Sequence, residues 1–92
     1  MGIEIRLPLT DLQNRVLAFA FEFIHGNLYP PTVKEIQEAL DIPNPGTVHK
    51  AIQALEKKGY LAKEKRVARG IRLTALGEEV CGLERQLRLE LE

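Results

Sequence analysis

The segment TVKEIQEALDIPNPGTVHKAIQALEKKG, residues 32–59, contains two helix patterns joined by a short turn. Thr32 and Glu35 form a capping box, in which each side chain satisfies a free backbone N–H at the start of a helix. Asn44 is a favoured N-cap residue, and Pro45 suits the first helical position because no N–H is needed there. A short helix, a tight turn and a second capped helix predict a helix-turn-helix.

Each helix of this segment has one apolar face, and the turn between them, residues 41–43, places Ile42 toward the core. Gly59 ends the second helix, which we expect over residues 45–58. The residues expected to face the core are Val33, Ile36, Ala39, Leu40, Val48, Ala51, Ile52 and Leu55. The outer face of the second helix is small, polar or cationic and consists of Gly46, Thr47, His49, Lys50, Gln53 and Lys57.

A longer helix precedes this segment. Thr10 and Gln13 form another capping box, and apolar residues then recur at helical spacing up to residue 24. We expect the helix to stop at residues 25–27, with Gly26 in the left-handed conformation and His25 near the terminal carbonyls. Before it, Ile3–Leu7 alternates apolar and charged side chains and Pro8 ends the run, which predicts a short strand or an arm over residues 1–8.

The periodicity changes after Gly59. Residues 60–64 and 71–73 read as strands, and residues 65–70 form a basic loop that ends in glycine. Three helices followed by a basic hairpin is the order of a winged helix-turn-helix. The expected fold class is therefore mainly α with a small β-hairpin wing (α+β), followed by a C-terminal helix. We expect the winged domain to span residues 9–74.

The C-terminal helix is expected over residues 75–92, with Thr74 as its cap. Its apolar side chains fall on a seam close to a heptad pattern: Leu76, Val80, Leu83, Leu87 and Leu91. Two interpretations are open, since this seam can pack on the chain's own first helix or on a second copy. We favour the second, a homodimer interface. Cys81 is expected on the outer side of the helix, away from the seam.

The charge is unevenly distributed along the 92 residues, although the net charge is zero. Residues 47–72 carry eight Lys or Arg against two acidic residues, whereas the flanking parts are each net acidic. A locally basic region is the electrostatic pattern of a nucleic-acid binder. The single cysteine and the lack of a readable signal peptide favour a cytoplasmic location, and no apolar run is long enough to cross a bilayer.

Three stretches together resemble the DNA-binding domain of the LexA repressor family, over roughly residues 9–73. They are YPPTVKEIQEAL (29–40), AIQALEKKGYLAKE (51–64) and RGIRL (69–73). The resemblance implies DNA binding and favours repression. LexA proteins continue into a serine-lysine self-cleaving domain that also forms the dimer, but this sequence has no serine, so we expect a stand-alone domain without self-cleavage. The stretch NPGTVHK (44–50) does not repeat the family's usual base-reading side chains, which predicts a different operator.

Helix 45–58 is expected to lie in the major groove of double-stranded DNA, where each base pair shows a distinct donor and acceptor pattern. The wing, residues 63–72, is expected on the phosphate backbone or in the minor groove. A further phosphate is expected at the helix start near Thr32. The expected DNA-binding residues are Thr32, Asn44, Gly46, Thr47, His49, Lys50, Gln53, Lys57, Lys65, Arg66, Arg69 and Arg72.

Other functions fit the sequence less well. A protein–protein adaptor is the main alternative, although adaptors more often expose apolar or aromatic anchors. Binders of RNA or single strands present stacking aromatics, which are few here. An enzyme is not expected, because His25, His49 and Cys81 lie in three different elements without metal-ligand spacing. We expect no catalytic residues, cofactor, metal or small-molecule effector, and association with the nucleoid through DNA.

Overall fold

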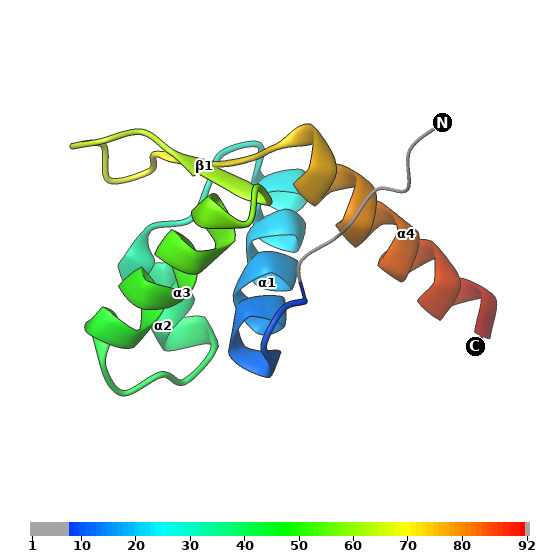
Figure 1. The fold of residues 1–92 in the computed structure, drawn as a ribbon, viewed down its shortest axis with the longest axis horizontal. Coiled ribbons are helices and arrows are strands. Elements are labelled where there is room, and N and C mark those ends of the chain that lie inside the picture. The colour runs from blue at the N-terminus through cyan, green and yellow to red at the C-terminus, as the bar shows by residue number, and fades with distance from the viewer. Residues whose placement is uncertain (1–7, 92) are drawn as a thin grey trace.

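A computed structural model describes residues 8–91, which form four helices and one two-stranded antiparallel hairpin (Figure 1). This confirms the predicted fold class. The predicted N-terminal strand or arm falls on residues that lie almost wholly outside the described range. The elements are α1 (Asp11–Asn27), α2 (Val33–Ala39), α3 (Pro45–Lys57), β1 (Leu61–Lys63), β2 (Ile71–Leu73) and α4 (Ala75–Leu91).

The predicted helix starts are confirmed by their hydrogen bonds. The Thr32 hydroxyl accepts from the backbone N–H of Glu35 at 3.1 Å, and the Glu35 carboxylate accepts from the Thr32 N–H at 2.8 Å. Thr10 and Gln13 form the same reciprocal pair at the start of α1. The Asn44 side chain accepts from the Gly46 N–H at 2.7 Å. Local capping chemistry therefore fixes where α1, α2 and α3 begin.

The end of α1 differs from the prediction. Gly26 lies inside the helix, which continues to Asn27, and Leu28 takes the left-handed conformation with a φ of 66°. His25 does not bond to the terminal carbonyls, because its Nε2 lies 2.7 Å from the Glu78 carboxylate of α4. The chain tolerates the left-handed leucine because its N–H donates to the Ile24 carbonyl at 2.8 Å and closes the helix.

The core lies where α1, α2 and α3 pack together, and these three helices form the left part of Figure 1. Its largest fully buried side chains include Val16, Ile36, Val48, Ile52 and Leu55. Ile42 is buried as predicted, so the turn between α2 and α3 is anchored to this core. Ala39 was predicted to face inward but is exposed, because the side of α2 that packs on the core is centred on Val33, Ile36 and Leu40 and Ala39 lies at its edge.

The wing, residues 61–73, is a short hairpin in which Leu61 pairs with Leu73, Ala62 with Arg72 and Lys63 with Ile71. The first strand is shorter than the predicted range 60–64. Because side chains alternate along a strand, Leu61, Lys63, Ile71 and Leu73 share one face. That face covers the helical core, since Leu61 and Ile71 are buried.

The two halves of α4 have different surroundings. Val80 and Cys81 are 9% and 6% exposed and pack beside α1, whereas Leu83, Leu87 and Leu91 are 46%, 58% and 87% exposed. Figure 1 shows the C-terminal half projecting away from the other helices. Cys81 was therefore wrongly predicted on the outer side. Burial and neighbouring carboxylates raise the pKa of its thiol to about 12.

Candidate nucleic-acid interface

The outer face of α3 is open along its whole length. Every residue predicted there is exposed, and none of their side chains forms a hydrogen bond or ion pair within residues 8–91. These residues are Gly46, Thr47, His49, Lys50, Gln53 and Lys57. On the opposite face of the helix, the buried side chains of Val48, Ile52 and Leu55 anchor it to the core. A rigid helix thus presents polar and cationic groups to a partner.

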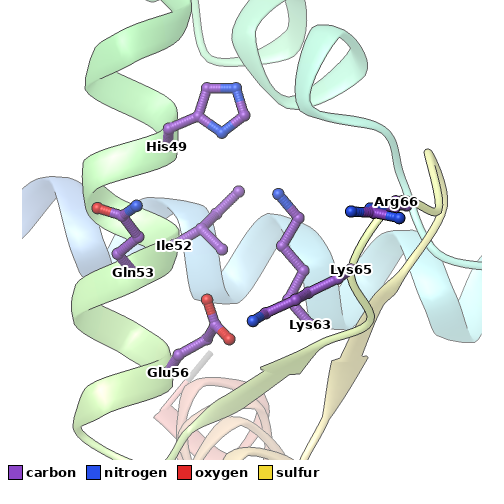
Figure 2. Close-up of a pocket in the computed structure, with 7 residues that line it drawn as sticks. All are labelled: His49, Ile52, Gln53, Glu56, Lys63, Lys65 and Arg66. Carbon is purple, nitrogen blue, oxygen red and sulfur yellow. The ribbon is translucent and has the colours of Figure 1, made fainter.

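A groove lies between α3 and the wing (Figure 2). We call it the α3–wing groove and define it by its lining residues: His49, Ile52, Gln53, Glu56, Lys63, Lys65 and Arg66. Two predicted helix residues, His49 and Gln53, and two predicted wing residues, Lys65 and Arg66, therefore share one depression. Lys65 and Arg66, which we call the wing tip, are exposed, and Arg66 takes a positive φ of 63° in the loop.

Lys63 was missed as a site residue. It shares the inner face of the wing with buried Leu61 and Ile71, so its stem leans over the core instead of into solvent. Figure 2 shows its ammonium end in the α3–wing groove. The signal was available, because Leu61 and Lys63 are two residues apart in a strand and must point to the same side.

Arg69 is engaged within the molecule. Its guanidinium donates two hydrogen bonds to the Glu35 carboxylate, at 2.7 and 3.1 Å, and a third to the Pro30 carbonyl at 2.9 Å. It also lies 4.7 Å from the centre of the Tyr29 ring. We call this arrangement the wing-root clamp. It ties the end of the hairpin loop to the start of α2.

The clamp changes the titration of Glu35. Hydrogen bonds from Arg69 and then from the Thr32 backbone lower the pKa of the Glu35 carboxyl from 4.5 to about 2. The same pairing raises the pKa of Arg69. Both groups therefore remain charged over the whole physiological range.

The start of α2 already carries hydrogen bonds and a negative charge of its own. The Thr32 N–H and hydroxyl are both used in the capping box, and the Glu35 carboxylate already lies at this helix start. The Asn44 side chain is likewise used as a cap. Thr32 and Asn44 thus fix where α2 and α3 begin.

Arg72 is separated from the α3–wing groove. It pairs with Ala62 on the outer face of the hairpin and lines a different hollow, together with Tyr29, Pro30 and Glu78. The structure therefore brings His49, Gln53 and Glu56 of α3 together with Lys63, Lys65 and Arg66. Arg69, Arg72 and Thr32 do not line this groove.

Histidine, cysteine and carboxylate side chains do not gather into a further site in the part of the chain that the structure describes. Among residues 8–91, no three His, Cys, Asp or Glu side chains are grouped so as to hold a metal ion. His25 pairs with Glu78, His49 lines the groove and Cys81 is buried. No helix in this range is both long and apolar enough to cross a membrane.

Comparison with known proteins gives one consistent family. The family model described as "LexA DNA binding domain" matches residues 6–70. A LexA repressor of Lactiplantibacillus plantarum is 46% identical over 72 residues, covering 78% of this chain and 34% of the relative. A LexA repressor of Anaeromyxobacter sp. is 43% identical, covering 80% and 32%, and LexA repressor 1 of Geobacter sulfurreducens is 45% identical, covering 84% and 41%.

The chain spans about a third of the length of these curated relatives. A crystal structure of a hypothetical protein superimposes with a TM-score of 0.74 and 24% identity, covering 89% of this chain and 25% of that one. This second likeness concerns the fold, and it agrees with the winged arrangement of α1 to α4 described above.

Proposed function

The chain belongs to the LexA DNA-binding domain family, and on this premise we propose that it binds double-stranded DNA in a sequence-specific manner and represses transcription. The observation that carries the proposal is the shared surface of α3 and the wing tip. Exposed polar and cationic side chains from both line one groove. The curated relatives are named repressors, which supports repression over activation.

In the proposed complex, α3 lies in the major groove, because a helix fits there and each base pair is distinguishable there. Lys50 suits the guanine acceptors, and Gln53 suits the paired donor and acceptor of adenine. Gly46 permits close approach, Thr47 offers a methyl and a hydroxyl, and His49 offers a ring nitrogen. Each well-formed base contact is worth about 1–3 kcal/mol of discrimination.

The remaining cationic side chains of this surface contact the sugar–phosphate backbone of the DNA. Lys57 is near the C-terminal end of α3 and meets a phosphate, while Lys65 and Arg66 reach a phosphate or the neighbouring minor groove. Arg69 is assigned to the wing-root clamp, because its donors are taken up by Glu35 and Pro30. Arg72 has no assigned contact with the same DNA surface, since it lies on the outer face of the hairpin.

The projecting half of α4 is proposed as the interface with a second copy of the chain. Leu83, Leu87 and Leu91 are exposed apolar residues on one side of this half, while Leu76 and Val80 help pack the helix against its own domain. A two-fold dimer would set two α3 helices about 34 Å apart and would require an inverted-repeat operator. Binding to chromosomal DNA would place the dimer at the nucleoid, in the cytoplasm.

Selection from a random duplex library tests this function. The chain is mixed with the library at about 50 and about 200 mM salt, and the retained DNA is sequenced. We expect an enriched inverted repeat whose retention falls steeply with salt. A single enriched half-site would support DNA reading without the dimer, and salt-sensitive retention without enrichment would contradict sequence-specific reading. No retention at the lower salt would contradict DNA binding and favour a protein–protein adaptor.

A further inference from the structure

We propose that one strand of the DNA backbone lies in the α3–wing groove and that Lys63 binds a phosphate of this strand. Glu56 faces the same strand and thereby lowers the affinity for DNA. The inference rests on the proposed function, because it concerns the same DNA surface. It assigns two residues, Lys63 and Glu56, that are not among the DNA-binding residues expected from the sequence.

The groove has two polar walls and an apolar floor. His49, Gln53 and Glu56 come from α3, whereas Lys63, Lys65 and Arg66 come from the wing (Figure 2). Ile52, which is 1% exposed, lies between the walls and closes the bottom. The walls thus supply donors and charges to an elongated group lying along the groove, while the floor offers no hydrogen bond.

The position of the groove determines what crosses it. The major and minor grooves of duplex DNA are separated by a single sugar–phosphate strand. If α3 lies in the major groove and the wing tip reaches the next minor groove, the strand between them must pass over the gap between α3 and the wing. That gap is the α3–wing groove, so its occupant is a backbone strand with its phosphates.

Lys63 is placed to meet a phosphate of this strand. Its inner-face position, opposite Ile71, carries the ammonium over the floor of the groove and not toward the outer side of the wing, where Arg72 lies. Within the described residues, Lys63 has no hydrogen bond or ion pair that would hold it away. One phosphate contact of this kind contributes about one unit to the slope of log affinity against log salt.

Glu56 has the opposite effect. Its carboxylate is directed into the groove from the α3 wall, as Figure 2 shows, where it faces the lysines of the wing. In the free protein it offsets part of their positive charge. In the complex it faces a phosphate of like sign, so it weakens binding to every duplex regardless of sequence.

The test measures binding of the full chain to a fluorescein-labelled duplex of mixed sequence by anisotropy, at several salt concentrations from about 50 to about 200 mM. The variants are Lys63→Met, Lys63→Arg and Glu56→Gln, and the control is Arg88→Gln, which removes an exposed cation of α4 outside the groove. The midpoint of thermal unfolding is recorded for each, so that loss of binding is not confused with loss of fold.

Lys63→Met is expected to weaken binding about 5- to 10-fold at low salt and to lower the salt slope by about one, whereas Lys63→Arg retains both. Glu56→Gln is expected to strengthen binding about 3-fold, and Arg88→Gln to change little. If the wild type binds but Lys63→Met and Glu56→Gln behave like the control, the groove assignment is wrong and the proposed function stands. If the wild type does not bind at low salt, the proposed function fails and the groove assignment fails with it.

Discussion

The root and the tip of the wing carry the same kind of charge but make different contacts. At the root, the Arg69 guanidinium is held by two oxygens of Glu35, by the Pro30 carbonyl and against the Tyr29 ring. At the tip, Lys65 and Arg66 are exposed and have no hydrogen bond or ion pair within the described chain. A basic residue in the sequence therefore contributes to the surface field only where no acid of the fold neutralises it.

Because their contacts differ, the root and the tip of the wing have separate physical roles. The root is also fixed from the α4 side: Thr74 donates its hydroxyl to the Gly59 carbonyl at 2.6 Å and accepts from the Gly77 N–H at 3.0 Å. Substitutions at the root are expected to act on stability and wing position, whereas substitutions at the tip are expected to act on DNA affinity.

The largest effect is expected at Gly77. A Cβ built at this position overlaps the Tyr60 carbonyl oxygen, which belongs to the backbone and cannot rotate away. Gly77→Ala should lower the free energy of unfolding by about 2 kcal/mol or more, measured by urea denaturation. The control is Gly82→Ala in the same helix, where a Cβ meets nothing within 4 Å and should stabilise by about 0.5–1 kcal/mol. Equal effects of the two substitutions would refute close packing at the root.

The next largest effect is expected at the wing tip. Replacing both Lys65 and Arg66 with alanine should weaken binding to mixed-sequence duplex DNA by about 10- to 30-fold at low salt, since two backbone contacts are lost, and should lower the salt slope by about two. The unfolding midpoint should not move, because neither side chain is held by the fold. An unchanged salt slope would show that the tip does not touch DNA.

A smaller effect on binding is expected at the clamp. Arg69→Met should weaken binding by about 3-fold, because an unclamped wing must be ordered on association. Unlike the tip variant, it should lower the thermal midpoint and leave the salt slope nearly unchanged. A loss of one full unit of slope would instead place Arg69 on a phosphate and remove the distinction between root and tip.

The smallest effect is the acid sensitivity of Glu35. Its pKa is 4.5 as an unperturbed group and about 2 in the folded protein, so its contribution to stability is complete above pH 4.5. This contribution is lost as the pH falls from 4.5 toward 2, because the unfolded chain then binds the proton more readily. Glu35→Gln should be less stable at pH 7 and should show a shallower decline over that window in thermal unfolding. Parallel declines for the two proteins would contradict the clamp.

Much of the fold could be predicted from the sequence because its signals are local. Capping boxes and the Asn-Pro start act within three residues, and they placed α1, α2 and α3 correctly. The end of α1 could not be read in the same way. Gly26 is the better left-handed residue by intrinsic preference, but the left-handed residue that closes the helix is Leu28, two residues later.

The site residues could be predicted from the sequence only where their exposure depends on a single helix or strand. The exposed face of α3 follows from helical periodicity, and the structure has these residues exposed. The clamp joins residues 34 positions apart, so no local pattern reveals that Glu35 takes up Arg69. Cys81 was misplaced for a similar reason: which side of α4 faces α1 is set by tertiary packing, not by the leucine spacing.

Chemical interference on a selected operator tests the central claim most directly. The claim is that α3 and the wing tip read one continuous DNA surface, with α3 in the major groove. Methylation at guanine N7 should block binding within one major-groove segment of each half-site, and ethylation should block it at phosphates of the adjoining strand. Tight binding that tolerates all N7 methylation, or interference confined to adenine N3 in the minor groove, would contradict it.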